Sequence, residues 1–182
     1  MKVALLSFSM LLSLFFSVSV EAQEPPKKME VVSIFGGMFE MRIPKNLPLD
    51  TAKNNKKFEG TLMGEAYRNM QAYAFLNISM DKLKPHELSK TIGETTDTLA
   101  NILLEMYPNL VLKNKGIVTQ SGKQFGFIEM GGTIEGMAVS SINYLYLDNG
   151  TLISFEFQNL MVVTEAWVEA GKEMMQSIKI NW

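Results

Sequence analysis

The chain has 182 residues and a formal net charge of −2, and 47% of its residues are hydrophobic and 20% charged. These proportions are typical of a folded domain and argue against collagen-like, coiled-coil and disordered classes. The lack of cysteine excludes disulfide scaffolds, thiol nucleophiles and iron–sulfur clusters, and a single histidine excludes a His–His metal site. We therefore expect one folded domain that carries no cofactor and has little scope for catalysis.

The first 22 residues have the features of a secretory signal peptide. Lys2 supplies a short positive start, residues 3–20 are apolar apart from serines, and Val20-Glu21-Ala22 places small residues where a signal peptidase cuts. The alternative is a transmembrane anchor, since an apolar run of this length could just span a bilayer. We favour cleavage after Ala22, which predicts an exported protein, periplasmic or extracellular in a Gram-negative bacterium, with no membrane span left.

The folded domain is expected to span residues 31–182. Residues 23–30 contain Pro25-Pro26 and two lysines, which disfavour regular structure, so we predict a flexible leader there. Cleavage of the signal removes one lysine and one glutamate, so the net charge stays at −2. Because the domain has no basic excess, we expect no nucleic-acid partner.

The first half of the domain is predicted to contain three strands and a helix. Residues 31–35 and 38–43 are β-type runs on either side of Gly36-Gly37, a pair that suits a two-residue hairpin turn. A third alternating run, residues 71–80, follows a polar loop. Over residues 85–108, apolar side chains recur at three- and four-residue spacing between two prolines, which predicts an amphipathic helix.

The second half is predicted to be a strand meander followed by a helix. The β-type runs cover residues 110–120, 123–135, 138–147 and 151–158, and the helix covers residues 164–177. Because the connections between the runs are short, neighbouring strands should be antiparallel. No βαβ alternation is present, so we predict the α+β class, with a single antiparallel sheet of six or seven strands flanked by two main helices.

The dipeptide Asn149-Gly150 is the most specific turn signal in the sequence. Both central residues of the favoured hairpin turn need a positive φ, which Asn tolerates and Gly adopts freely. A two-residue turn here sets Tyr144 opposite Phe155 and Tyr146 opposite Ile153.

The preceding turn, taken as Gly136-Met137, sets Glu129 opposite Tyr144 and so places a carboxylate among aromatic side chains. Burial there would raise the pKa of Glu129 and let it carry a proton or bind a cationic or hydroxylated ligand. A one-residue slip, or a bulge near Gly131-Gly132, would instead turn Glu129 to the opposite face. We therefore name Glu129, Tyr144 and Tyr146 as candidate ligand or partner contacts, and we assign no catalytic, cofactor-binding or metal-binding residue.

The order of elements resembles a known fold family. The resemblance rests on the strand Phe39-Glu40-Met41-Arg42-Ile43-Pro44-Lys45-Asn46, on Tyr144-Leu145-Tyr146, on Gly150-Thr151-Leu152-Ile153-Ser154-Phe155, and on the final Met175-Gln176-Ser177-Ile178-Lys179-Ile180. In these features the chain is similar to the PsbP/DcrB-like superfamily, whose fold is shared with a Ran-binding nuclear-import factor. The resemblance implies an α/β/α sandwich about one antiparallel sheet, exported bacterial members, and members that work by binding proteins. No residue matches a photosystem or Ran interface closely enough for a role to be carried over.

Three functions are open at this point. The first is an exported, non-enzymatic accessory domain that binds a protein partner through its surface. The second is a carrier of a small apolar ligand or lipid, with the two central strands at residues 138–147 and 151–158 lining a cavity. The third is a hydrolase built around Glu129 or Asp148, which is the weakest because no second acid, histidine or lysine has a sequence-derived reason to lie beside either residue.

Overall fold

Strands make up most of the fold in the computed structural model, which describes residues 24–50 and 61–182. The predicted signal peptide and part of the predicted loop before residue 61 lie outside the described residues. The elements in chain order are β1 (Met29–Ile34), β2 (Phe39–Pro44), β3 (Thr61–Asn69), β4 (Ala74–Lys82), α1 (Ile92–Met106), β5 (Leu110–Gln120), β6 (Lys123–Ile134), β7 (Met137–Asp148), β8 (Thr151–Met161), α2 (Glu165–Gln176) and β9 (Lys179–Ile180). The predicted α+β class is confirmed.

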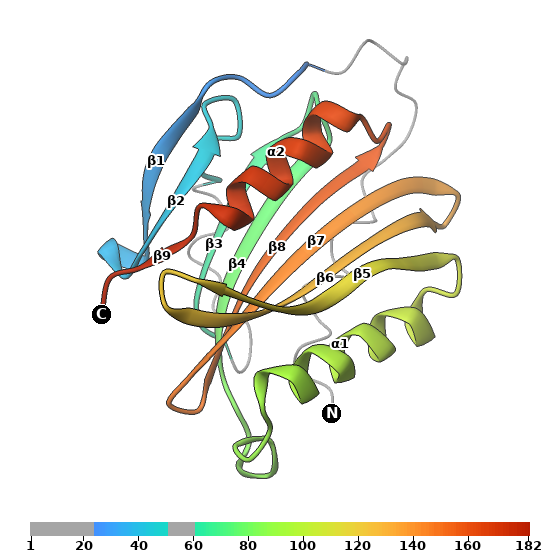
Figure 1. The fold of residues 1–182 in the computed structure, drawn as a ribbon. Coiled ribbons are helices and arrows are strands. Elements are labelled where there is room, and N and C mark those ends of the chain that lie inside the picture. The colour runs from blue at the N-terminus through green and yellow to red at the C-terminus, as the bar shows by residue number, and fades with distance from the viewer. Residues whose placement is uncertain (1–23, 51–60) are drawn as a thin grey trace.

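The strands form two antiparallel sheets, so the prediction of a single sheet is wrong (Figure 1). A three-stranded sheet has the order β1-β2-β9, and a six-stranded sheet has the order β3-β4-β8-β7-β6-β5. The first hairpin forms a separate sheet with β9, which pairs with the edge of β2 opposite β1, Phe39 with Ile180 and Glu40 with Lys179. The sequence does not reveal β9, since a two-residue strand is too short to show alternation.

The strand β3, at one edge of the larger sheet, is not among the strands predicted from the sequence. Its sequence contains Gly64, Glu65 and Asn69, residue types that are depleted in strands. Pairing with β4, from Asn69 opposite Ala74 onward, holds it in place. Pairing with β4 therefore overrides the weak preference of this local sequence for strand structure.

Two predicted boundaries differ in the structure. The β1–β2 connection has four residues rather than two, because the pairing ends at Ile34 opposite Phe39, although the two glycines do take positive φ angles of 66° and 98°. The helix α1 begins at Ile92 and not at Pro85. Pro85 instead begins a short 3-10 turn that ends at Glu87. Thr91 caps α1: its hydroxyl accepts from the backbone N–H of Glu94 at 3.2 Å, and the Glu94 carboxylate accepts from the N–H of Thr91 at 2.8 Å.

The two helices pack on opposite faces of the six-stranded sheet. Thr96 of α1 lies against Gly126 of β6, whereas Gly171 of α2 lies against Phe157 of β8 and Ile142 of β7. Gly126 and Ile142 are on opposite faces because side chains alternate along paired strands. The three-stranded sheet shares the core on the α2 side, and its fully buried contributions are Ile34, Phe39, Met41 and Ile43. In the part of the chain that the structure describes, neither helix is long and apolar enough to cross a membrane.

Candidate functional site

The predicted β7–β8 hairpin is confirmed. Asn149-Gly150 occupies the turn with φ angles of 44° and 77°. Tyr144 pairs with Phe155 and Tyr146 with Ile153, as the two-residue turn requires. The register of the centre of the sheet therefore follows from one dipeptide.

The β6–β7 register differs from the predicted one. The turn is centred on Glu135-Gly136, one residue earlier than expected, and these residues take φ angles of 49° and 81°. As a result Glu129 lies opposite Ile142, and Phe127 takes the predicted place of Glu129 opposite Tyr144. The pairing shifts by two positions, so each side chain keeps its face. Glu129 is on the aromatic face as predicted, although its cross-strand partner is different.

The aromatic side chains of this face are in contact with one another. The ring centroids of Phe125 and Tyr146 are 5.3 Å apart, and those of Phe127 and Tyr144 are 6.2 Å apart. Tyr144 and Tyr146 are buried members of the core beneath α2. Burial, with a smaller contribution from the charge of Glu129, raises the pKa of Tyr144. The two tyrosines thus pack the core, whereas the side chain of Glu129 remains 20% exposed.

A lysine lies beside Glu129, although no sequence pattern predicts one there. Lys172 Nζ of α2 is 3.9 Å from Glu129 Oε1 and 3.0 Å from Glu169 Oε1. The hydrogen bond to Glu169 and then the charge of Glu129 raise the pKa of Lys172. Sequence reasoning could identify the pair Glu169–Lys172 from its helical spacing. The contact with Glu129 depends on where α2 crosses the sheet, which no local pattern specifies.

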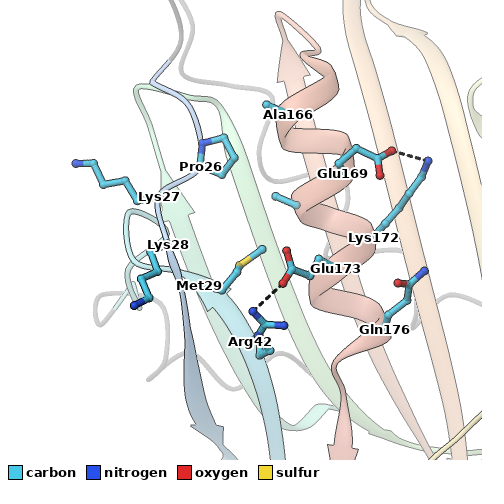
Figure 2. A pocket seen from close by; sticks show the side chains of 11 residues that line it. Pro26, Lys27, Lys28, Met29, Arg42, Ala166, Glu169, Lys172, Glu173 and Gln176 are labelled. Atoms are coloured by element: carbon cyan, nitrogen blue, oxygen red, sulfur yellow. Dashed lines mark hydrogen bonds and ion pairs between the residues drawn. The ribbon is translucent and has the colours of Figure 1, made fainter.

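An open groove runs along the other side of α2, between the helix and the β1–β2 hairpin (Figure 2). Its volume is about 580 Å³. It is lined by Pro26, Lys27, Lys28, Met29, Arg42, Ala166, Glu169, Ala170, Lys172, Glu173 and Gln176. Arg42 of β2 and Glu173 of α2 point toward each other and form an ion pair of 2.9 Å. The groove therefore combines a partly apolar wall with charges of both signs.

The segment just before β1 forms one wall of the groove, and hydrogen bonds hold this segment against the rest of the domain. The indole N–H of Trp167 donates to the backbone carbonyl of Glu24 at 2.8 Å. The side-chain amide of Asn46 donates to the carbonyl of Pro25 at 2.9 Å and accepts from the N–H of Lys27 at 2.8 Å. The described part of the predicted leader is thus attached both to α2 and to the end of β2, and β1 begins inside it at Met29.

The charged side chains around α2 form ion pairs. Glu129 and Glu173 each face a cation, Lys172 and Arg42 respectively. Among residues 24–50 and 61–182 no group of three or more His, Asp or Glu side chains is arranged to hold a metal ion. Paired, partly exposed charges beside an apolar wall suit recognition of a complementary surface.

No protein-family model and no curated protein matches this sequence. Solved structures do match its fold. Cyanobacterial PsbP from Synechocystis superposes with a TM-score of 0.60 at 12% identity, over 93% of this chain and 99% of that one. The Saccharomyces cerevisiae Ran-binding protein Mog1p gives 0.56 at 11% identity, over 85% and 96% of the two chains. LpqN of Mycobacterium tuberculosis, described as involved in cell envelope biogenesis, gives 0.51 at 10% identity, over 84% and 90%. The chain therefore has a PsbP/Mog1-like fold, as the sequence resemblance predicted, and at these identities the likeness concerns the fold alone.

Proposed function

We propose that this protein is an exported, non-enzymatic accessory domain that binds another protein through the groove between α2 and the β1–β2 hairpin. The observation that carries the proposal is the groove itself, which is open and lined by elements from both ends of the chain. Its partly exposed ion pair, Arg42–Glu173, can exchange its internal contact for contacts with a partner. Binding there needs no reorganisation of the core.

The fold similarity supports this proposal at a general level. Mog1p, which has the same fold, is a Ran-binding protein. The core beneath α2 offers less support for a carrier of apolar ligands, because the side chains expected to line a cavity instead pack against one another. Phe155 and Phe157 are fully buried in that core with Ile142 and Tyr144. This packing supports a working surface outside the core, at the groove.

The proposal includes the domain organisation that the sequence predicts. Residues 1–22 would direct export and be removed, and the folded domain would act in the periplasm or outside the cell. The segment from Pro26 to Met29, which forms part of the groove wall, would then lie close to the new N-terminus. Removal of the signal would leave the groove-lining residues in the mature protein.

Site-specific photocrosslinking in the bacterial envelope tests the proposal. A photoreactive residue would replace Ala166 or Gln176, which are both exposed and line the groove. The matched control replaces Asn101, which is exposed on α1 on the opposite face of the sheet. We expect one discrete protein adduct from both groove positions and none from the control. An adduct of equal yield at Asn101, or adducts to lipid alone at the groove, would contradict protein binding at this surface.

A further inference from the structure

The α1 side of the six-stranded sheet carries a set of polar side chains at its centre. Glu156 of β8 lies directly between Asn77 of β4 and Asn143 of β7. One row along, Gln158 of β8 is paired with Ser141 of β7 on the same face. We refer to these five residues as the Glu156 cluster. Asn143, Gln158 and Ser141 are buried, whereas Glu156 and Asn77 keep part of their surface accessible, so the cluster can be reached from solvent.

Within the described residues, the internal hydrogen bonds of the cluster leave several acceptor oxygens unoccupied, and its side-chain amides also keep N–H donors. The side-chain N–H of Gln158 donates to Glu156 Oε1 at 2.8 Å, and that of Asn143 donates to Ser141 Oγ at 2.9 Å. The second carboxylate oxygen of Glu156 and the amide oxygens of Gln158 and Asn143 accept no hydrogen bond from the described residues. A site with several open acceptors is complementary to a ligand that carries several hydrogen-bond donors.

Among the residues that the structure describes, the carboxyl group of Glu156 also has no cationic partner. No lysine or arginine nitrogen of the described chain lies within 4.0 Å of it. The charged or titratable side chains on this side of the sheet include Tyr107 at the end of α1, Tyr73 before β4, Asp81 on β4, Glu135 in the β6–β7 turn, the Asp97–Lys115 ion pair between α1 and β5, and Arg68 on β3, whose guanidinium is 3.0 Å from Asp50. Burial raises the pKa of Glu156 to about 7, because its charge is poorly solvated and uncompensated there. A partly buried acid with a raised pKa in the middle of a sheet is an unusual feature for a purely structural residue.

We propose that the Glu156 cluster binds a protonated primary amine. The ammonium group would form an ion pair with Glu156 and donate to the amide oxygens of Gln158 and Asn143, so that its three N–H donors meet three acceptors. The amine belongs either to a lysine side chain of a partner or to a free alkylamine. This site is on the opposite face of the sheet from the groove, and it is independent of the proposed protein-binding function.

Titration of the isotope-labelled protein with butylamine, followed by NMR, tests the assignment. At about pH 8 Glu156 is mostly ionised, and at about pH 5.5 it is mostly neutral, while the amine stays charged at both values. We expect the side-chain amide signals of Asn77, Asn143 and Gln158 to shift on titration, and the affinity to fall by about tenfold or more at the lower pH. Glu156→Gln, which preserves size and the acceptor for Gln158, should abolish the shifts.

The controls separate this site from a general attraction of cations. Glu105→Gln removes the same charge from an exposed position on α1 and should leave the affinity unchanged. Tetramethylammonium, which has no N–H donor, should not bind. A lysine peptide that binds more tightly than butylamine assigns the amine to a partner protein, and the reverse order assigns it to a free amine. Shifts that persist in Glu156→Gln, equal binding of tetramethylammonium, or binding of Ca²⁺ alone would overturn the proposal.

Discussion

The indole N–H of Trp167 on α2 donates a 2.8 Å hydrogen bond to the backbone carbonyl of Glu24, from the segment before β1. The same ring is fully buried and stacks on Phe157, with an interplanar angle of 20°. One side chain thus connects the six-stranded sheet, α2 and the first described residue of the chain. The contact lies next to the groove in sequence, because Ala166 and Pro26, which both line it, are close to Trp167 and Glu24.

The first prediction concerns this contact. Trp167→Phe keeps an aromatic ring but removes the N–H donor and leaves a cavity, so we expect the free energy of unfolding to fall by about 1–3 kcal/mol. Chemical denaturation measures the change. The matched control is Trp182→Phe, because Trp182 is 46% exposed and should tolerate the substitution with little loss. Equal losses in the two variants would show that the hydrogen bond and burial of Trp167 do not stabilise α2.

The second prediction concerns the close approach of α2 to the sheet. A Cβ at Gly171 would lie 2.4 Å from Cδ1 of the Phe157 ring and 3.1 Å from Ile142, both in the core. Gly171→Ala should therefore destabilise the protein by about 1–3 kcal/mol, although alanine is the better helix former. Gly93→Ala on α1 is the control, since its Cβ would be 3.5 Å from its nearest neighbour. We expect that variant to be neutral or more stable in thermal denaturation, and a stable Gly171→Ala would refute the packing argument.

The parts of the structure that could be predicted are those with a local cause. Asn149-Gly150 specifies its own turn, and the turn specifies the pairing of Tyr144 with Phe155. The β6–β7 turn is predicted at Gly136-Met137 but lies at Glu135-Gly136. Gly136 fits either central position of a hairpin turn, and the positive φ of Glu135 has no clear sequence signal. The error changed the cross-strand partner of Glu129 but not its face.

The parts that could not be predicted depend on contacts between distant segments. The pairing of β9 with β2 needs the chain to return after α2, and the contact of Lys172 with Glu129 needs α2 to cross the sheet at one particular place. The Glu156 cluster was missed for a related reason. Asn77, Asn143 and Glu156 come from three strands, and only the β4–β8–β7 order brings them into one row.

The third prediction concerns the electrostatic coupling of Glu129 to Tyr144. Burial and the charge of Glu129 both raise the pKa of Tyr144, so its phenol should ionise above the ordinary value of about 10. Glu129→Gln should lower that pKa while leaving it above the ordinary value, because burial is the larger cause. Ultraviolet titration of phenolate absorbance, with Tyr144→Phe to assign the signal, measures the shift. An unchanged Tyr144 pKa would mean that solvent screens the two groups from each other.

The fourth prediction concerns export. Expression of the full chain in a Gram-negative host should yield a periplasmic protein that begins at Gln23, and intact mass spectrometry would detect the loss of residues 1–22. Ala22→Arg should block processing, because signal peptidase requires a small residue before the cut, whereas Ala22→Gly should be processed normally. A full-length protein retained in the membrane fraction for the natural sequence would favour the anchor alternative.

The fifth prediction concerns the pH dependence of stability that Glu156 imposes. Its pKa is about 7 in the folded protein, compared with an ordinary value of 4.5. The folded state therefore binds the proton more tightly, and stability is highest below the ordinary pKa and is lost as the pH rises toward 7. This one group should remove up to about 3 kcal/mol over that interval.

Glu156→Gln separates this contribution from the other carboxylates, because glutamine resembles the neutral acid at every pH. We expect the variant to be more stable than the natural protein at about pH 8 and nearly equal to it at about pH 4. Urea denaturation at a series of pH values measures both. Glu105→Gln, which changes an exposed acid on α1, should follow the natural protein across the range. If the two glutamine variants gave the same pH profile, Glu156 would have to ionise as freely as a surface acid, and the buried amine site would lose its physical basis.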